Sequence, residues 1–260
     1  MAELDFSIDE TGIGTLVVNR PHVRNAFNWA TMETFAKLVE DLYSQPNLRV
    51  LIVSGTGKAF VSGGDLSELQ YYPLPEHGER LARIMGDALR HFEALPCPTI
   101  AAINGPARGG GAEVAMACDM RVIAEDADIG FVHTRLGIIT AWGGGQRLLR
   151  TVGYARALEL LTTGRILNAS EALALGLVNT IAPAYGTLEA ARGIAVQMAA
   201  NPIECVQATK RFLRCGLSEP EPVALAAERA EFPALWDTEF RRQAVQKFLN
   251  KSATQVNGKV

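Results

Sequence analysis

Two short apolar runs, each followed by a glycine-rich loop and a helical pattern, constrain the fold of this chain most strongly. The runs are Val50–Val53 and Thr99–Ile103. A continuous apolar run of this length, without polar alternation, is typical of a β-strand that is covered on both faces. Because helices must provide that cover, the two runs predict an α/β fold.

Further strands and amphipathic helices alternate around these two runs. Residues 4–8 alternate between apolar and polar side chains, which predicts a half-buried strand. Asn28 can cap a helix whose apolar stripe runs from Met32 to Leu42. The remaining predictions are strands over residues 15–18, 121–124 and 177–181, and helices over about 77–94 and 112–118.

After about residue 186 the pattern is entirely helical. Thr187 can cap one helix, and Asn201 followed by Pro202 is a typical start of the next. The sequence therefore predicts an α/β core over residues 1–185 and a helical C-terminal region over residues 186–260.

Composition and charge exclude several classes of protein. The 260 residues carry a net charge of −3, which does not indicate binding along a nucleic acid backbone. The four cysteines show no CxxC spacing, so reduced thiols are expected. The first residues are acidic, unlike a signal peptide, and no apolar run approaches the roughly 18 residues of a membrane span. We therefore expect a cytoplasmic protein that does not bind nucleic acid or span a membrane.

The glycine-rich stretches do not match the common nucleotide or metal motifs. The stretch from Ser54 to Lys58 lacks the first glycine and the final Ser or Thr of a phosphate loop. The stretch from Gly105 to Gly111 is not GxGxxG, and no acidic residue follows at the distance that a dinucleotide site needs. The histidines and cysteines have no zinc-ligand spacing, so no metal site is predicted.

Two of the glycine-rich loops can instead form an anion site together. Gly109–Gly111 lies at a helix start, where backbone N–H groups lack partners and the helix dipole is positive. Ser62–Gly64 also follows a buried strand and leads into a short helix near Asp65. If each loop directs one N–H toward a single oxygen, the pair is an oxyanion hole, although most glycine-rich turns are only turns.

Several long motifs resemble those of the crotonase superfamily, the enoyl-CoA hydratases and isomerases. The motifs span about residues 4–251: Asn19-Arg-Pro21 with Asn25-Ala26, Lys58-Ala-Phe-Val-Ser-Gly-Gly-Asp-Leu66, Ala102-Ile-Asn-Gly-Pro-Ala-Arg-Gly-Gly-Gly-Ala-Glu113 with Ala117-Cys-Asp119, Gly143-Gly-Gly-Gln-Arg-Leu148 and Ala172-Leu-Ala-Leu-Gly-Leu-Val178. The resemblance implies a crotonase-type spiral of ββα turns, with the helical C-terminal region mediating assembly of a homotrimer or a dimer of trimers.

The resemblance also implies a small-molecule acyl-CoA thioester as substrate, with no cofactor beyond the CoA moiety. The thioester oxygen would accept hydrogen bonds from the backbone amides of Ser62 and Gly110. The remaining residues that the resemblance assigns to CoA binding are Arg24, Ala26, Gly63, Gly64, Asp65 and Leu66, together with Ser62 itself.

Two positions bear on the reaction. Hydratases of this family use two glutamates, and Glu113 matches the first of them. Its alternative interpretation is an acid in the first helical turn that stabilises the helix dipole. His133 stands where the second glutamate is expected, so ordinary hydration lacks one of its two proton-transferring groups.

The residues around His133 are most similar to ethylmalonyl-CoA and methylmalonyl-CoA decarboxylases within the superfamily. Decarboxylation needs no base to remove a proton, and a histidine can bind the carboxylate or protonate the enolate. The predicted function is therefore decarboxylation of a methylmalonyl- or ethylmalonyl-type CoA, with Ser62, Gly110, Glu113 and His133 as catalytic residues. Three alternatives remain open: an enoyl-CoA hydratase or isomerase that uses Glu113, a CoA thioester hydrolase with His133 as base, and a non-catalytic acyl-CoA-binding subunit.

The end of the chain is basic. Five basic and no acidic residues follow Phe240. Phe248-Leu-Asn-Lys251 resembles the terminal stretch of the family, whose lysine lies near the CoA nucleotide. We expect Lys251 to bind a CoA phosphate, and the alternative is a solvated helix face.

Overall fold

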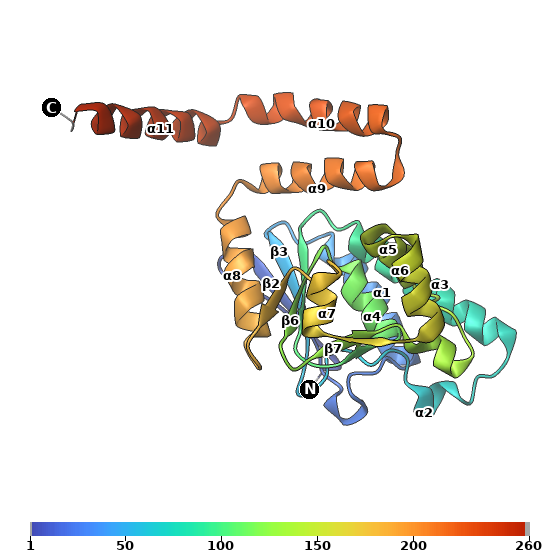
Figure 1. Cartoon of the computed structure of the whole chain (residues 1–260). Helices are drawn as coiled ribbons and strands as arrows, with labels where there is room; N and C mark the ends of the chain where they lie inside the picture. Colours follow the sequence, from blue (N-terminus) through green and yellow to red (C-terminus); the bar gives the residue numbers. More distant parts are fainter. Residues whose placement is uncertain (1, 258–260) are drawn as a thin grey trace. The chain divides into compact units, whose positions relative to one another are not determined.

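The computed structural model describes the backbone of residues 2–257 and the side chains of residues 2–250. The chain divides into two compact units, Met1–Ala199 and Ala200–Val260. The first unit holds two β-sheets and most of the helices, and the second unit is helical (Figure 1).

The main sheet of the first unit has six strands in the order β1-β2-β3-β4-β6-β9. β1 and β2 are antiparallel, and every other neighbouring pair in this sheet is parallel. The strand bounds are β1 Leu4–Ile8, β2 Ile13–Val18, β3 Val50–Gly55, β4 Thr99–Ile103, β6 Met120–Ala124 and β9 Thr180–Ala182.

Successive residues of the central strands enter two different hydrophobic cores. In β3, Val50 and Ile52 belong to one core, whereas Leu51 and Val53 belong to the other. The first of these cores is closed by α8 (Thr187–Ala199), which contacts β2, β3, β4, β6 and β9 and lies along the sheet in Figure 1. Both faces of the strand are therefore covered, which explains why its sequence is continuously apolar.

Seven helices of the first unit lie outside the core that α8 closes. Asn28 caps α1 as predicted, because its side chain accepts a hydrogen bond from the Thr31 amide at 2.8 Å. Buried side chains of α1, α3 and α4 form the second, larger core with β3 and β4. The bounds are α1 Trp29–Leu42, α2 Leu66–Leu69, α3 Pro75–Glu93, α4 Gly110–Ala117, α5 Gly144–Val152, α6 Tyr154–Thr163 and α7 Ala169–Ala174.

A second, three-stranded sheet accompanies the main one. Its order is β5-β7-β8, with β5 parallel and β8 antiparallel to the central β7. These strands and two 3₁₀ helices were not predicted, because each is too short to show a periodic pattern. Their bounds are β5 Ala107–Arg108, β7 Asp128–Gly130, β8 Ile166–Asn168, η1 Pro21–Val23 and η2 Val132–Leu136.

One predicted strand has different bounds in the structure. The strand expected over 177–181 is β9, Thr180–Ala182, and the buried Leu177 and Val178 belong to the turn before it. From Thr187 on, the described residues form helices, and the first of these, α8, belongs to the first unit because Ala191 and Ala195 are buried against the sheet.

The second unit, as far as residue 257, contains three helices: α9 Ile203–Ser218, α10 Glu221–Trp236 and α11 Glu239–Asn257. α9 and α10 pack together, and Arg211 of α9 forms an ion pair with Glu231 of α10 at 2.7 Å. Arg241 of α11 stacks over the ring of Trp236, 3.7 Å from its centroid. These contacts connect consecutive helices of this unit.

Candidate functional site

The two glycine-rich loops that follow β3 and β4 meet backbone to backbone. The Val61 carbonyl accepts a hydrogen bond from the Arg108 amide at 3.2 Å. A Cβ added to Gly63 would lie 3.0 Å from the Gly110 nitrogen, and one added to Gly111 would lie 1.7 Å from the Val61 oxygen. Only residues without a side chain allow this approach, so the glycines bring the two loops together.

Ser62 and Gly110 therefore lie in adjacent loops, as the sequence predicted. Gly110 is the first residue of α4, where an amide has no acceptor within the helix. Across residues 2–257, neither the Ser62 amide nor the Gly110 amide donates a hydrogen bond to another protein group. Both N–H groups are thus available to an oxygen of a ligand.

Glu113 lies in the first turn of α4, and all of its polar contacts are to protein groups. It is 1% exposed. Oε2 accepts hydrogen bonds from the Trp142 amide at 2.9 Å and from the Gly144 amide at 2.7 Å. Oε1 lies 3.0 Å from Nε2 of His133. The carboxylate therefore joins the start of α5 to η2. These contacts account for its position without any interaction with the dipole of α4.

His133 lies in η2 and is 8% exposed. Nε2 contacts Glu113, whereas Nδ1 is buried and has no hydrogen-bond partner among the described residues. A Cβ on Gly109 would lie 3.8 Å from Nε2, so the ring is also next to the loop that carries Gly110. The structure thus brings together three residues that the sequence singled out, Gly110, Glu113 and His133.

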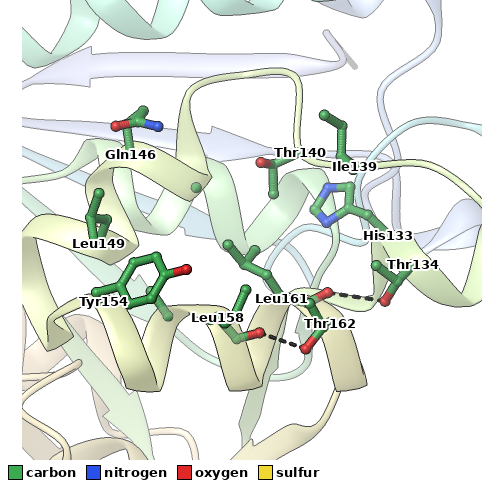
Figure 2. Close-up of a pocket in the computed structure, with 12 residues that line it drawn as sticks. His133, Thr134, Ile139, Thr140, Gln146, Leu149, Tyr154, Leu158, Leu161 and Thr162 are labelled. Atoms are coloured by element: carbon green, nitrogen blue, oxygen red, sulfur yellow. Dashed lines mark hydrogen bonds between the residues drawn. The ribbon is translucent and has the colours of Figure 1, made fainter.

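A cavity of about 300 Å³ begins at His133 and lies between α5 and α6. Figure 2 shows His133 at one end of the labelled side chains and Tyr154 with Leu149 at the other. The Thr134 hydroxyl donates to the Leu161 carbonyl at 3.1 Å, which fixes η2 against α6. The lining residues carry no Asp, Glu, Lys or Arg: His133, Thr134, Ile139, Thr140, Gly145, Gln146, Leu149, Tyr154, Ala157, Leu158, Leu161 and Thr162.

A second cavity, of about 240 Å³, lies on the side of Ser62. Three basic side chains, Arg24, Lys58 and Arg108, contribute to its wall. Arg108 is paired with Asp128, its Nη2 lying 2.6 Å from Oδ2, whereas Arg24 and Lys58 are exposed. The remaining lining residues are Pro21, Thr56, Ala59, Ser62 and Pro106.

The residues assigned to CoA binding by resemblance lie along this second cavity and the adjoining loop. Arg24 and Ser62 line the cavity directly. Ala26 is buried, and its carbonyl accepts a hydrogen bond from Arg20. Gly63 and Gly64 extend the loop next to Phe27, through a 2.8 Å bond from the Phe27 amide to the Gly63 carbonyl and a bridge to Gly64. Leu66 is exposed, and Lys251 lies in α11 but its side chain is outside the described part of the structure.

Asp65 differs from the other members of this set, because its carboxylate is fully engaged within the protein. It caps α2 by accepting from the Ser67 amide at 3.2 Å, and it lies 3.2 Å from Nη2 of Arg20. Burial by itself raises the pKa of Asp65, but the hydrogen bonds from Ser67 and the charge of Arg20 outweigh it and leave the pKa below 3.8. Its side chain therefore holds the loop in place.

Sequence reasoning missed two polar groups that support the site. Asn25 has a positive φ of 59°, and its side-chain amide donates to the carbonyls of Thr56 and Ala59 at 3.0 and 2.8 Å. Arg147 donates to the Trp142 carbonyl at 2.8 Å and to Glu93 at 3.2 Å. Both residues fall within motifs that the sequence analysis quoted, but no pattern in the sequence identifies their partners.

No group of three or more His, Cys, Asp or Glu side chains in the described part of the chain is arranged to hold a metal ion. None of the helices described is both long enough and apolar enough to cross a membrane.

Comparison with known proteins identifies the family. The sequence model of the family "Enoyl-CoA hydratase/isomerase" matches residues 9–259. Enoyl-CoA isomerase/hydratase fer4 of Mycosarcoma maydis is 36% identical over 266 residues, covering 99% of this chain and 97% of the relative. Ethylmalonyl-CoA decarboxylase of Gallus gallus is 33% identical over 236 residues, covering 90% of this chain and 79% of the relative.

The fold agrees with a solved structure of the same family. The crystal structure of an enoyl-CoA hydratase from Bacillus anthracis superposes with a TM-score of 0.91 at 33% identity, covering 96% of this chain and 97% of that one. The crotonase-type fold that the motifs predicted is thereby confirmed. The chain belongs to the enoyl-CoA hydratase/isomerase family, a family of enzymes.

Proposed function

We propose that this protein is an acyl-CoA lyase that removes carbon dioxide from a methylmalonyl- or ethylmalonyl-type CoA thioester. One observation carries the proposal. Glu113 is held by two backbone amides and by His133, so it is not free to move protons to and from water, and the second glutamate of a hydratase is replaced by that same histidine. The site therefore suits a reaction that needs an enolate to be stabilised and then protonated, without a base.

The amides of Ser62 and Gly110 stabilise the charge that this reaction develops. When the bond between Cα and the carboxylate breaks, its electron pair moves into the thioester, and negative charge accumulates on the thioester oxygen. Two unpartnered N–H groups in adjacent loops can both donate to that oxygen. Each such donor is worth roughly 3–4 kcal/mol in the transition state.

The balanced reaction consumes one proton. Carbon dioxide leaves with the carboxylate carbon, and the enolate takes a proton at Cα to give the shortened acyl-CoA. His133 supplies this proton, because its ring lies beside the Gly109–Gly110 loop and at the entrance of the apolar cavity. The alkyl group of the substrate occupies that cavity, which has no charged lining residue in the part of the chain described.

The second cavity suits the nucleotide end of CoA. Arg24 and Lys58 are exposed cations on its wall, and a CoA pyrophosphate and 3′-phosphate need such partners. Lys251, from the basic C-terminal tail, adds a further cation. No cofactor beyond the CoA moiety is needed for this chemistry.

A second candidate function is hydration or isomerisation of an enoyl-CoA with Glu113 as the acid–base group. It is favoured by the names of relatives, which include an enoyl-CoA isomerase/hydratase at 36% identity. Both oxygens of the Glu113 carboxylate are already engaged within the protein, Oε2 by two backbone amides and Oε1 by His133, which argues against this candidate.

A panel of substrates separates the two candidates. Methylmalonyl-, ethylmalonyl-, crotonyl- and acetyl-CoA would be supplied separately, and carbon dioxide, hydrated product and free thiol would be measured in each. We expect carbon dioxide from the malonyl-type substrates and at most slow hydration of crotonyl-CoA. Rapid hydration without decarboxylation would overturn the proposal, free thiol would indicate a hydrolase, and no turnover would indicate a binding subunit.

We also propose that the protein acts in the cytoplasm as a homotrimer or a dimer of trimers. The support is the family membership and the separate helical unit over residues 200–260. Light scattering at several protein concentrations measures the mass directly, and a monomer would contradict this assembly.

A further inference from the structure

Two adjacent residues beside the second cavity have backbone conformations in the left-handed region. Arg24 has a φ of 55° and Asn25 has a φ of 59°. Asparagine tolerates this region, whereas it is unfavourable for arginine. A residue keeps such a conformation only where its surroundings hold it there, and residues of this kind are frequent at ligand clamps. The contacts of Asn25 therefore bear on how Arg24 comes to line the cavity.

Asn25 is completely buried, and one end of its side chain fixes the turn that carries Arg24. Its relative exposure is 0%. Oδ1 accepts a hydrogen bond from the Arg20 amide at 2.9 Å, and the Asn25 amide donates to the Arg20 carbonyl at 2.8 Å. These two bonds join the ends of the segment 20–25, so they determine the backbone conformation at Arg24.

The other end of the same side chain holds the loop that carries Lys58. Nδ2 of Asn25 donates to the Thr56 carbonyl at 3.0 Å and to the Ala59 carbonyl at 2.8 Å. Since a side-chain amide has two hydrogens to donate, both are used here. The two acceptors lie on either side of Lys58 in the sequence. One buried side chain thus connects the backbone next to Arg24 with the backbone around Lys58.

A second asparagine, Asn104, holds the Lys58 loop alone. Its Nδ2 donates to the Gly57 carbonyl at 3.0 Å, and its Oδ1 accepts from the Gly55 amide at 3.1 Å. Within the described part of the chain, the hydrogen bonds of this side chain are all to residues 54–59. Asn104 therefore fixes one of the two cations, whereas Asn25 fixes both.

We propose that Asn25 is a positioning residue that holds Arg24 and Lys58 at a fixed separation, so that the two cations bind the phosphates of CoA as one preformed clamp. The identity of the ligand rests on the proposed function, which puts the CoA nucleotide in the second cavity. Both cations are exposed on the wall of that cavity. Fixing their backbones in advance reduces the conformational entropy that is lost on binding. Asn25 is fully buried, so it acts through the two cations and does not touch the ligand.

Binding of CoA itself tests the clamp without any turnover. Asn25→Gly keeps the positive φ without strain, adds no charge and removes both donors to the Lys58 loop. An exposed ionic contact changes an equilibrium constant about fivefold or less, so disturbing two of them should raise Kd for CoA about three- to tenfold. Calorimetry at low salt measures this Kd. An unchanged Kd in folded Asn25→Gly would overturn the inference.

A double-mutant cycle separates positioning from a general loss of structure. In protein that already carries Arg24→Ala and Lys58→Ala, the clamp has no cations to hold. Asn25→Gly should therefore raise Kd for CoA no further in this background. An effect as large as in the wild-type background would mean that the substitution acts through the fold as a whole, and the inference would be wrong.

Asn104→Ala is the matched control for Asn25→Gly. It loosens only the loop that carries Lys58, so its effect on Kd should vanish in the Lys58→Ala background. Asn25→Gly should keep part of its effect in that background, because it still disturbs Arg24. Equal behaviour of the two variants there would remove Arg24 from the clamp and contradict the inference.

Kinetics and a second variant complete the test. With the best substrate of the panel, Asn25→Gly should raise KM and leave kcat within about twofold, because a contact to the nucleotide is the same in the ground state and the transition state. If glycine prevents folding, Asn25→Ser takes its place, since a hydroxyl has one hydrogen and cannot bond both carbonyls. A fall in kcat at constant KM would overturn the inference with either variant.

Failure of the proposed function gives a different pattern. If the CoA nucleotide does not occupy the second cavity, Arg24→Ala with Lys58→Ala leaves Kd for CoA unchanged, and the clamp falls together with the site. If those substitutions weaken binding but Asn25→Gly does not, the site stands and only the clamp is wrong. If CoA binds but no malonyl-type substrate releases carbon dioxide, the proposed reaction fails, while every Kd of the cycle still tests the clamp.

Discussion

A Cβ added to Gly110 would lie 2.3 Å from Cζ3 of Trp142. Trp142 is 3% exposed, and its ring packs near Phe27 with 6.4 Å between the ring centroids, so the indole cannot easily move away. Its backbone amide is one of the two that hold Glu113. Trp142 therefore sets the position of the Gly110 amide on one side and of the Glu113 carboxylate on the other.

Gly110→Ala should consequently abolish most activity. The added methyl group must displace either the indole or the start of α4, and either movement shifts the Gly110 amide. Loss of one oxyanion donor lowers kcat by about 10²–10³-fold. Steady-state kinetics on the best substrate of the panel would measure this loss of kcat. A kcat within a few-fold of wild type would contradict the assignment of the Gly110 amide as an oxyanion donor.

Gly193→Ala is the matched control for Gly110→Ala. Gly193 lies within α8, and a Cβ there meets no atom within 4 Å. Alanine is favoured over glycine in a helix by roughly 0.5–1 kcal/mol, so this variant should be slightly more stable and equally active.

The buried ion pair of Arg147 and Glu93 should contribute to stability as well as to the site. Arg147 bridges Glu93 and the Trp142 carbonyl, and its side chain is 6% exposed. Arg147→Met removes the nearer of two arginines from Glu93, since Nη2 of Arg150 lies 3.6 Å from Oε1 of that carboxylate. Breaking a buried pair costs about 3–5 kcal/mol, which lowers Tm by roughly 10 °C in a domain of this size.

The double variant Glu93→Gln with Arg147→Met distinguishes the loss of the Arg147 charge from the loss of packing around its side chain. If the loss comes from the Glu93 carboxylate that no longer faces Arg147, calorimetry should show that the second substitution restores most of Tm. A double variant less stable than Arg147→Met alone would indicate that packing around the guanidinium is what matters.

Elements that bury a regular face were predictable, and contacts between distant segments were not. Val50–Val53 and the stripe after Asn28 were located correctly, because burial on both faces or on one face leaves a periodic pattern in the sequence. Glu113 shows the limit. Its place in the first turn of α4 was evident, but its partners come from residues 133, 142 and 144, which only the fold brings to it.

The same limit applies to Asp65. The motif places Asp65 in the loop but does not predict what its side chain contacts. In the structure the carboxylate pairs with Arg20, which is 45 residues earlier in the chain. Tertiary ion pairs of this kind leave no local pattern in the sequence. The resemblance therefore located the loop, while the structure was needed to find what holds it.

Asp65→Asn should destabilise the protein at neutral pH but not at low pH. The folded protein lowers the pKa of this carboxyl below 3.8, so its ionised form favours folding. That contribution is complete well above 3.8 and is lost as the pH falls below 3.8 through the folded value. Asparagine preserves the N-cap of α2, which isolates the effect of the charge.

Urea unfolding of wild type and Asp65→Asn at pH 7, 5, 4 and 3 would measure this dependence. The difference in free energy of unfolding between the two proteins should be constant down to about pH 5 and then shrink. A difference that persists unchanged at pH 3 would mean that the carboxylate charge is not what Arg20 requires.

Lys58→Ala should raise KM and leave kcat nearly unchanged. Lys58 is an exposed cation on the second cavity, remote from the reacting carbon in the proposed complex. An exposed ionic contact is worth about 1 kcal/mol or less, so KM should rise a few-fold at low salt. The effect should fade as ionic strength increases, because salt screens exposed charges.

Lys37→Ala is the control for Lys58→Ala. Lys37 is an exposed cation on α1, so Lys37→Ala removes the same charge from a different part of the surface. If KM changes equally in the two variants, the effect comes from the net charge of the protein. The second cavity would then not be part of the CoA site.

The size of the first cavity should set the preferred length of the alkyl branch. A Cβ on Gly145 would lie 2.7 Å from Oγ1 of Thr140 and 3.7 Å from Cδ1 of Leu161, so Gly145→Ala narrows the cavity. Leu161→Ala widens it. A buried methylene is worth about 0.8 kcal/mol, so in wild type each added methylene should raise kcat/KM about fourfold until the cavity is full.

The test is kcat/KM for methyl-, ethyl-, propyl- and butylmalonyl-CoA in both variants. Gly145→Ala should move the optimum to a shorter branch and Leu161→Ala to a longer one, because the two changes alter the same space in opposite directions. Gly78→Ala, on α3 where a Cβ meets no atom within 4 Å, should leave the profile unchanged. If both cavity variants lower kcat/KM equally for every substrate, the alkyl branch binds elsewhere. The first cavity, between α5 and α6, would then have another occupant.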